Sequence, residues 1–456
     1  MGPLLRRAAL APTLVTVAAT AACQWQRVGS DTRPDPSVVV PQLFNPAALY
    51  TRMGFFAAGP PLPFVASLQY LATSSPDTTL ALFGLSMANS ALSFRQAGQA
   101  LEARYQAEVV LRRAGSVLAR AVSEETVRVA SRDEARRADE SVIFQQFLQV
   151  PPGAYDAVVT VRDEYGTSVG RAERQIGVPR VGPRGLSDVV AVYRVEPRGA
   201  RTEAPRVLLN PRATVPFGLD TLRLYLEGYG YPAGTPVAVR VTVDGGREVW
   251  SGEVALAGTP QLGAAVVTLS PDQLPVGELR AVARVEATQD SSRVAAALVS
   301  FSEQWAITNF DEVLSLLRYF GQDRAIGEMR AADPVERPAL WRTFWRATDP
   351  NPLTPQNEAL ELYFRRVQEA NARFRETGDA GWLTDRGEVF ITLGEPDEIF
   401  DSSSDLQGTR RIVRWNYLGQ RLTLDFVDDT GFGRFRLTPT SRAEYQRVLN
   451  SIRSRN

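Results

Sequence analysis

From about residue 41 to residue 303, hydrophobic and polar residues alternate mostly with a period of two, the pattern of β-strands that bury one face. The segment 64–72 (FVASLQYLA) shows this alternation, so we predict a half-buried strand there. Further on, Tyr155 follows a Pro152–Gly153 turn and precedes another alternating run. This entry into a late strand is typical of immunoglobulin-like or fibronectin-like sandwiches, in which the tyrosine secures a corner.

A proline- and glycine-rich segment at residues 177–185 (GVPRVGPRG) interrupts this pattern. The alternation then resumes, with leucines at every second position over residues 222–226. The Asp-Gly-Gly sequence at 244–246 separates two further alternating runs and is a strong signal for a hairpin turn. We therefore predict two tandem β-sandwiches, one over residues 41–180 and one over residues 186–303.

From residue 304, the hydrophobic period changes to that of helices. Asn309 and Glu312 have the spacing of a capping box, which predicts that a helix begins there. Asp333 and Glu336 repeat this spacing before a second helix. A third helix is predicted from residue 354 onward. Its predicted inward face consists of Leu360, Phe364, Val367, Ala370 and Phe374.

Four β-strands are predicted after these helices. The segment 387–392 (GEVFIT) is rich in β-branched and aromatic residues, and three more strands are expected at 410–419, 421–429 and 433–439. Helices followed by an antiparallel sheet make an α+β module, here over residues 304–450. The predicted fold class is therefore mainly β plus α+β, with two tandem β-sandwiches, a helical segment and a small antiparallel-sheet domain.

The amino terminus has the organisation of an export signal. Arg6 and Arg7 precede an apolar run over residues 8–22 that is too short to span a bilayer comfortably. The small residues ahead of Cys23, the only cysteine, resemble the lipobox of bacterial lipoproteins, in which this cysteine carries the lipid. The resemblance implies a signal peptide at residues 1–22 and lipidation of Cys23.

Thr20 departs from the lipobox pattern, where leucine or a similar apolar residue is usual, so an ordinary cleaved signal peptide is the alternative. Residues 23–40 contain the candidate lipidation site followed by a polar, proline-containing sequence, which predicts a flexible tether. We expect the protein on the periplasmic side of the cell envelope. Gln24, after the cysteine, favours an outer-membrane lipoprotein, by resemblance to the sorting rules of enteric bacteria.

The composition excludes much of the common catalytic chemistry. The 456 residues include no histidine and one cysteine, and all 51 basic residues are arginine. The chain therefore lacks an imidazole base, a lysine for Schiff bases or phosphate loops, an intramolecular disulfide and a thiolate zinc cluster. Carboxylate chemistry and oxygen-ligand metals such as calcium remain. Since the formal net charge is zero, we expect no nucleic-acid partner, and we expect no cofactor.

The C-terminal third resembles the GWxTD-domain family, whose name corresponds here to Gly381, Trp382, Thr384 and Asp385. The similarity continues through the sequence TDRGEVFITLGEPDEI and covers roughly residues 304–440. This resemblance implies a bacterial, mostly secreted or lipid-anchored protein, and a domain without an established activity.

We interpret the motif as a structural hinge. Gly381 and Gly387 would permit positive φ at bends, and Trp382 would be a large buried anchor. Thr384 or Asp385 would satisfy the unpaired amides of the turn. Arg386 would pair with a nearby acid, while Leu383 and Phe390 would supply core. The residues to which we assign a structural role are Gly381, Trp382, Thr384, Asp385, Arg386, Gly387, Gly394, Pro396 and Asp397.

The acids around Pro396 leave two alternatives open. A hydrolase acting on envelope glycan or peptide would need two carboxylates about 5 to 9 Å apart across a cleft, and Glu395, Asp397 and Glu398 cluster locally. These acids, or those of residues 425–429 (DFVDD), could instead bind calcium. Both alternatives compete with ordinary solvated acids at turns.

Tyr225, Tyr229 and Tyr231 suggest a third alternative, a carbohydrate-binding protein in which these rings stack on sugars or peptides. Tyrosines that fix strand ends are the simpler interpretation. The function we expect is that of a non-enzymatic, lipid-anchored cell-envelope protein. In this hypothesis, the two sandwiches hold the GWxTD domain away from the membrane, where it binds an envelope protein.

Overall fold

The computed structural model describes residues 25–28, 46–136, 141–243, 246–301, 309–354, 357–376, 379–402 and 411–453. The chain divides into two compact units. The larger unit comprises Pro34–Ala372, and the smaller one, called the C-terminal unit below, comprises Met1–Arg33 and Arg373–Asn456. The predicted signal peptide and Cys23 lie outside the described residues. Within the described ranges, no helix combines the length and apolar character needed to cross a membrane.

The first sandwich of the larger unit consists of two antiparallel sheets. One sheet contains, in spatial order, β2 (Phe56–Ala58), β3 (Phe64–Ala72), β4 (Thr79–Ala88) and β8 (Ser141–Val150). The other contains β10 (Val169–Val178), β9 (Gly153–Asp163), β6 (Ala100–Arg113) and β5 (Arg95–Ala97), with β7 (Ser116–Val129) also paired to β6. The Tyr155 hydroxyl donates to the Pro151 carbonyl over 2.7 Å, which confirms the predicted corner.

The second sandwich also has two sheets. One contains β13 (Arg206–Leu209), β12 (Val190–Glu196), β15 (Leu222–Tyr229), β19 (Leu262–Leu269) and β18 (Ala257–Thr259), with β11 (Gly185–Leu186) paired to β15. The other contains β14 (Thr214–Pro216), β22 (Ala295–Ser300), β20 (Gly277–Val285), β16 (Pro236–Val243) and β17 (Arg247–Ala255), with β21 (Asp290–Ser291) paired to β20. The predicted hairpin joins β16 to β17, although residues 244–245 of its turn lie outside the described residues.

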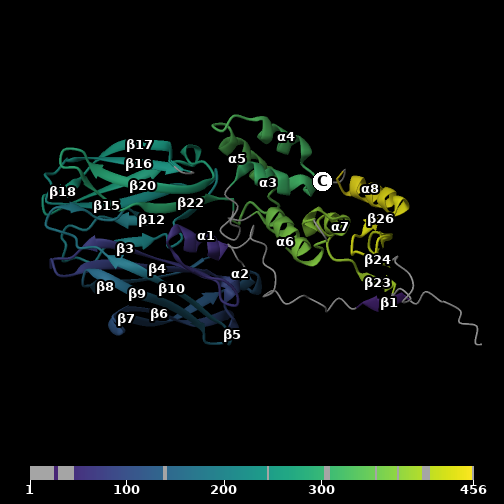
Figure 1. Cartoon of the computed structure of the whole chain (residues 1–456), viewed down its shortest axis with the longest axis horizontal. Helices are drawn as coiled ribbons and strands as arrows, with labels where there is room; N and C mark the ends of the chain where they lie inside the picture. The colour runs from purple at the N-terminus through teal and green to yellow at the C-terminus, as the bar shows by residue number, and fades with distance from the viewer. Residues whose placement is uncertain are drawn as a thin grey trace, which may run out of the picture. The chain divides into compact units, whose positions relative to one another are not determined.

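The two sandwiches stack face to face, so their sheets form successive layers (Figure 1). Within the first sandwich, Phe83 of β4 and Val159 of β9 belong to one hydrophobic core. At the junction, Leu82 of β4 and Val192 of β12 belong to a second core. The sheet that contains β3 and β4 is therefore covered on both faces. This corrects the prediction of a half-buried strand at 64–72, because β3 lies in such a sheet and is buried along most of its length.

A buried ion pair reinforces this junction. Arg198 and Glu227 form two parallel hydrogen bonds of 2.8 Å, and their side chains are 1% and 0% exposed. Arg198 also donates to the Ala72 carbonyl at 2.6 Å, and the Ala72 N–H donates to the Tyr229 hydroxyl at 2.9 Å. Because Ala72 is in the first sandwich and Glu227 in the second, these bonds tie the two inner sheets together.

The helices after the second sandwich are α3 (Phe310–Leu316), α4 (Asp323–Ala331), α5 (Arg337–Thr348) and α6 (Glu358–Arg373). The Asn309 side chain accepts two main-chain N–H groups of the first turn of α3, which confirms the predicted cap. Phe301, just after β22, packs against Phe310 and Trp341 at ring-centroid distances of 5.9 and 4.7 Å. Because of such contacts, residue 304 is not a boundary between the compact units. The predicted inward residues of α6, Leu360, Phe364, Val367 and Ala370, are buried.

The C-terminal unit has an α+β fold. Its antiparallel sheet contains, in spatial order, β1 (Trp25–Val28), β23 (Glu398–Ser402), β24 (Arg411–Tyr417), β25 (Leu422–Asp428) and β26 (Arg436–Leu437), and its helices are α7 (Asp385–Leu393) and α8 (Pro439–Arg453). The rings of Phe374, Phe390, Trp415 and Phe426 pack in series at centroid distances of 4.8 to 5.5 Å and build its core. The fold class is thus mainly β plus α+β, as predicted.

Residues 387–392 (GEVFIT) belong to helix α7, so the predicted strand is wrong. Thr384 caps this helix, and Asp385 and Glu388 lie in its first turn, beside the positive end of the helix dipole. These signals for a helix start outweigh the β propensity of the β-branched and aromatic residues, which is a weak and context-dependent preference.

A short strand lies within the predicted flexible tether. Trp25–Val28 forms β1, which pairs antiparallel with β23, so that Trp25 lies opposite Ser402 and Val28 opposite Ile399. The structure corrects the tether prediction for these four residues. The segment directly after the candidate lipidation site therefore belongs to the sheet of the C-terminal unit.

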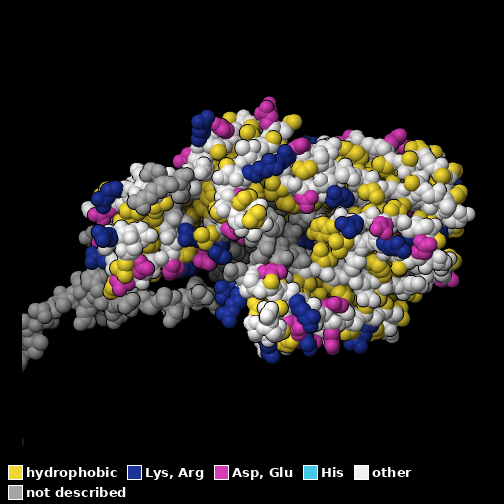
Figure 2. Space-filling model, turned by 180° about the vertical axis from the view of Figure 1, so that it is seen from behind, with side chains coloured by type: hydrophobic (Ala, Val, Ile, Leu, Met, Phe, Trp, Pro, Cys, Tyr) yellow, Lys and Arg dark blue, Asp and Glu magenta, His cyan; other side chains and the backbone are white. Residues whose placement is uncertain are grey.

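Charged side chains of both signs are mixed on the face that Figure 2 shows. On the face shown in Figure 2, arginine and acidic side chains are interspersed, without an extended area of one sign. Many arginines pair locally, as Arg324 does with Glu328 one helical turn away at 2.9 Å. Exposed pairs of this kind contribute little to stability, so the charge pattern bears on solubility more than on fold.

Candidate functional site

The GWxTD motif forms a compact turn at the start of α7. Gly381–Leu383 makes a single 3₁₀ turn, η5, and Thr384 is the N-cap of α7. The Thr384 hydroxyl donates to the Gly381 carbonyl at 2.8 Å and accepts the Gly387 N–H at 3.1 Å. Because this side chain is buried, the two bonds satisfy polar groups that water does not reach, which confirms the predicted role of Thr384.

The motif glycines act through close contact. Neither Gly381 nor Gly387 has a positive φ, so that prediction is wrong. A Cβ atom on Gly387 would lie 2.0 Å from the Gly381 carbonyl oxygen, far inside van der Waals contact. Glycine is therefore needed at position 387 to let α7 touch η5. Gly394, by contrast, has a φ of 87° and is the C-cap of α7, a conformation that favours glycine.

Trp382 and Leu383 are more exposed than predicted. Trp382 is half-buried, and Leu383 is 42% exposed, so its predicted place in the core is wrong. Phe390 is 2% exposed and contributes to the core, as predicted. Truncation of Trp382 should therefore cost less than the roughly 3 to 5 kcal/mol expected for a fully buried aromatic residue.

Asp385 and Arg386 connect the motif to distant parts of the C-terminal unit. Asp385 accepts the Leu437 N–H of β26 at 2.8 Å and pairs with Arg442 of α8 at 2.6 Å. Arg386 pairs with the buried side chain of Glu376 at 3.3 Å, which confirms the predicted acid partner. The motif thus fastens α7 to the sheet edge and to α8, a geometry suited to a scaffold.

The acids in the turn before β23 have separate partners. Glu395 forms a two-pronged ion pair with Arg373, with one bond of 2.7 Å. Asp397, which follows Pro396, accepts the main-chain N–H of residue 418 at 2.6 Å. Glu398 accepts an asparagine amide of β24 at 3.1 Å. Each carboxylate therefore has a structural contact. Within the described ranges, no group of three acids is placed to hold a metal ion.

The connection between β25 and β26 presents an aromatic side chain that the sequence analysis missed. Phe432 is 79% exposed, and its neighbours Gly431 and Gly433 have φ values of 73° and 79°. The buried carboxylate of Asp428 accepts the N–H groups of Thr430, Gly431 and Gly433 at 2.7 to 3.0 Å, and the Thr430 hydroxyl at 2.8 Å. We call residues 428–433 the Phe432 loop. An aromatic residue between two glycines in a turn is the signal that could have identified it.

The Asp428 carboxylate is ionised in this setting. Burial raises its pKa, but the hydrogen bonds from Thr430, Gly433 and Gly431 outweigh burial and hold the pKa below its ordinary value. Its oxygens are thus occupied by main-chain donors. Asp425, the other acid considered for calcium, pairs with Arg414 at 2.6 Å. These contacts give both acids structural roles, and the loop is held by its own hydrogen bonds.

The three tyrosines considered for sugar stacking are buried. Tyr225, Tyr229 and Tyr231 are 0%, 0% and 2% exposed, so the predicted stacking platform is wrong. The hydroxyls of Tyr225 and Tyr229 donate to Glu227 at 2.7 and 2.5 Å, and that of Tyr231 donates to Asp290 at 2.5 Å. Tyr225 and Tyr229 satisfy the buried acid Glu227 at the junction of the sandwiches, and Tyr231 bonds the partly exposed Asp290 at a strand end.

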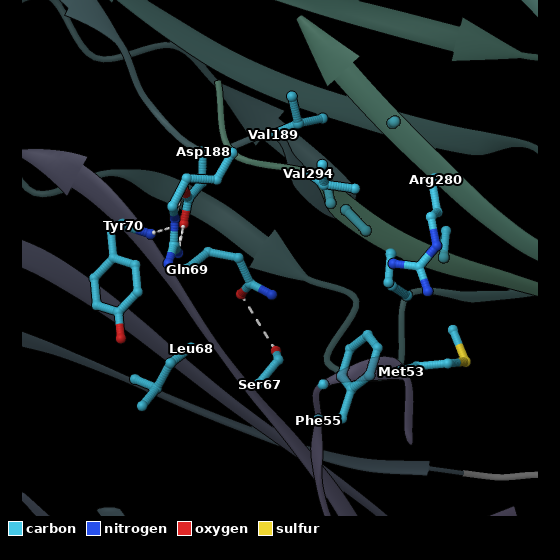
Figure 3. A pocket seen from close by; sticks show the side chains of 18 of the residues that line it. Met53, Phe55, Ser67, Leu68, Gln69, Tyr70, Asp188, Val189, Arg280 and Val294 are labelled. Atoms are coloured by element: carbon cyan, nitrogen blue, oxygen red, sulfur yellow. Dashed lines mark hydrogen bonds and ion pairs between the residues drawn. The ribbon is translucent and has the colours of Figure 1, made fainter. Parts of the chain in front are cut away.

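A cavity of about 300 Å³ opens between the two sandwiches of the larger unit. Figure 3 shows Arg280 of β20 and Gln69 of β3 extending into it from opposite walls. The Ser67 hydroxyl donates to Gln69 at 3.3 Å, and Asp188 pairs with Arg293 at 2.5 Å on a third wall. These residues come from distant segments of the chain, so nothing in the sequence pointed to this site.

Residues 284–429 match the family model of the GWxTD domain. The match begins in β20 and ends just after β25, so it covers about the C-terminal third of the chain, where the motif was recognised. A comparison with curated proteins found no match.

Two solved structures cover about half of this chain in a structural comparison. The adhesin domain of Epf from Streptococcus pyogenes has 10% identity and a TM-score of 0.15, covering 52% of this chain and 77% of that chain. The serine-rich repeat protein Srr2 from Streptococcus agalactiae has 8% identity and a TM-score of 0.17, covering 54% and 95%. At these TM-scores, the similarities support no conclusion about this chain.

Proposed function

We propose that this protein is a non-enzymatic, lipid-anchored envelope protein whose C-terminal unit, which carries the GWxTD motif, binds a protein partner through the Phe432 loop. The observation that carries this proposal is the exposed Phe432 ring on a loop that Asp428 already orders. A pre-ordered loop loses little conformational freedom on binding. Aromatic anchors are also enriched among the residues that dominate interface energies.

The chemistry of the chain supports a binding role. It has no histidine or lysine, so the side chains that most often transfer protons or form covalent intermediates near neutral pH are absent from the sequence. Acids that a hydrolase would use, such as Glu395 and Asp397, are engaged with an arginine and with a main-chain amide. Binding of a protein partner requires neither histidine nor lysine side chains.

The pairing of β1 with β23 supports an anchor close to the C-terminal unit. Cys23 precedes Trp25 by two residues, and two extended residues span at most about 7 Å. A lipid on Cys23 would therefore hold the β1 edge of this sheet near the membrane surface. This placement differs from the hypothesis that the sandwiches keep the GWxTD domain away from the membrane, so our proposal places the C-terminal unit beside the bilayer.

Photo-crosslinking in the native cells tests the partner-binding proposal. Amine-reactive cross-linkers are unsuitable because the chain has no lysine. We would therefore introduce p-benzoylphenylalanine at position 432 and, as a matched control, at position 418, whose leucine is 63% exposed in the β24–β25 turn. We expect a specific protein adduct from position 432 only, and its loss when Asp428→Ala disorders the loop.

Equal adducts from both positions, or none from position 432 in a properly folded protein, would contradict binding through the Phe432 loop. The anchor is tested separately by Cys23→Ser. We expect this variant to move from the membrane fraction to the soluble fraction. A variant that stays in the membrane fraction would show that the cysteine does not carry the anchor.

A further inference from the structure

The edge of β3 is only partly covered by another strand. β2 pairs with β3 from Phe64 to Ala66, with Phe56 opposite Ala66, whereas β3 continues to Ala72. Beyond Ala66, none of the described strands pairs with β3 on that side. An uncovered strand edge presents main-chain N–H and C=O groups that can pair with another chain.

Polar groups of the second sandwich cover the far end of this edge. The Tyr70 N–H donates to the Asp188 carboxylate at 2.9 Å, and the Tyr70 carbonyl accepts the Asp188 N–H at 3.1 Å. The Ala72 N–H donates to the Tyr229 hydroxyl at 2.9 Å. Because alternate residues of a strand direct their main-chain groups to the same side, Leu68 presents its N–H and C=O on this edge. It lies in the gap between β2 and Asp188.

The cavity between the sandwiches lies at this gap and has an excess of positive charge. Leu68, Arg174 and Arg280 all line it. Asp188, an acid that lines the same cavity, is paired with Arg293. Arg174 donates to a main-chain carbonyl at 3.3 Å. Among the described residues, no carboxylate lies within ion-pair distance of Arg174 or Arg280.

We propose that this cavity binds the carboxy-terminal residue of an extended peptide. Its carboxylate would pair with Arg280, since a guanidinium matches the planar geometry of a carboxylate. Its main-chain amide would pair with Leu68 at the uncovered edge of β3, which is the usual way a peptide adds to a sheet. The site lies in the larger unit and is independent of the partner proposed for the C-terminal unit.

The size of the cavity limits the length of the peptide that it can hold. A volume of about 300 Å³ is at the small end for ligand sites, and only one position of β3 is open between Ala66 and Tyr70. The cavity therefore takes the last residue or two of a peptide rather than a full strand. The apolar side chains of Met53 and Val294, the latter 58% exposed, line the same cavity and favour a small apolar last residue.

Calorimetric titration of the full chain with N-acetyl-alanyl-alanine tests this site, with the C-terminal amide of the same peptide and acetate as companion probes. Arg280→Gln should weaken binding of the free acid tenfold or more, as expected for the loss of a hydrogen bond to a charged group. Arg284→Gln is the matched control, because Arg284 lies on the same strand and does not line the cavity. This control should bind like the parent protein.

Four results would overturn the proposal. They are equal affinity for the acid and the amide, equal weakening by the two substitutions, acetate binding as tightly as the peptide acid, and no heat from the peptide acid at millimolar concentration. Acetate binding alone would identify an anion site without strand pairing. Thermal melting of both variants checks that the fold is intact, which is expected because both arginines are exposed.

Discussion

Gly387 and Gly381 approach so closely that no side chain fits between them. A Cβ atom on Gly387 would lie 2.0 Å from the Gly381 carbonyl oxygen and 3.1 Å from the Cα atom of Trp382. Both obstacles are main chain, which cannot rotate away as a side chain can. The contact sets the distance between η5 and α7, and therefore the place from which Asp385 reaches β26 and α8.

Gly387→Ala should destabilise the C-terminal unit. Overpacking at a close contact typically costs about 1 to 3 kcal/mol, and here it would also disturb the hydrogen bonds of Thr384. The free energy of unfolding from urea denaturation measures the effect. Gly419→Ala is the control in the same unit, because its φ is not positive and no atom lies within 4 Å of the added Cβ. Equal stability of the two variants would contradict the contact.

Arg198→Met should cost about 3 to 5 kcal/mol, because it leaves the fully buried Glu227 carboxylate without its cation. The double variant Arg198→Met with Glu227→Gln should recover part of this loss, since it removes both charges. Chemical denaturation of the single and double variants measures the coupling free energy. We expect the loss to appear in the larger unit, where the pair joins the two sandwiches.

The exposed pair of Arg171 and Glu173 provides the comparison, because both side chains are 57% exposed. Arg171→Met should change the free energy of unfolding by less than about 1 kcal/mol. If Arg198→Met were as mild as Arg171→Met, the buried pair would not hold the sandwiches together.

The free energy of unfolding should fall steeply above about pH 10. Burial, followed by the hydrogen bond to Asp290, raises the pKa of Tyr231 to about 12, and burial raises the pKa values of Tyr225 and Tyr229 as well. An unfolded tyrosine ionises near pH 10. The unfolded state therefore loses these protons first as the pH rises. The stabilising contribution is complete below about pH 10 and, for Tyr231, is lost between about pH 10 and about pH 12.

Urea midpoints measured from pH 8 to pH 12, together with tyrosinate absorbance, check this expectation. Tyr231→Phe should reduce the slope above pH 10, because it removes one proton whose pKa differs between the folded and unfolded states. A midpoint that stays constant up to pH 11 would show that these hydroxyls are not shielded from solvent.

The sequence predicted many strands correctly, since alternation is a property of neighbouring residues. β24 and β25 appear where the pattern placed them, and Tyr155 makes its predicted corner bond. Alternation does not reveal how many faces of a sheet are covered. The burial of β3 on both faces follows from the stacking of two sandwiches.

The sequence does contain a signal for the helix at residues 387–392, where a strand was predicted. Thr384, followed by Asp385 and by Glu388, is a helix-start signal that precedes the β-prone residues. The partial exposure of Trp382 was harder to predict from the sequence, because its neighbours in the chain do not indicate which segments pack on the ring. The cavity beside Leu68 could not be predicted at all, since its walls come from both sandwiches.

The sequence by itself determined which reactive side chains this protein lacks, where strands such as β24 and β25 lie, and where helices such as α3 begin. These properties depend on residue identity and on contacts between near neighbours. Only the tertiary structure decided that Tyr229 is buried, that Phe432 projects outward and that β1 joins the C-terminal sheet. Exposure and pairing depend on segments that are distant along the chain, and their positions are set by how all the layers pack together.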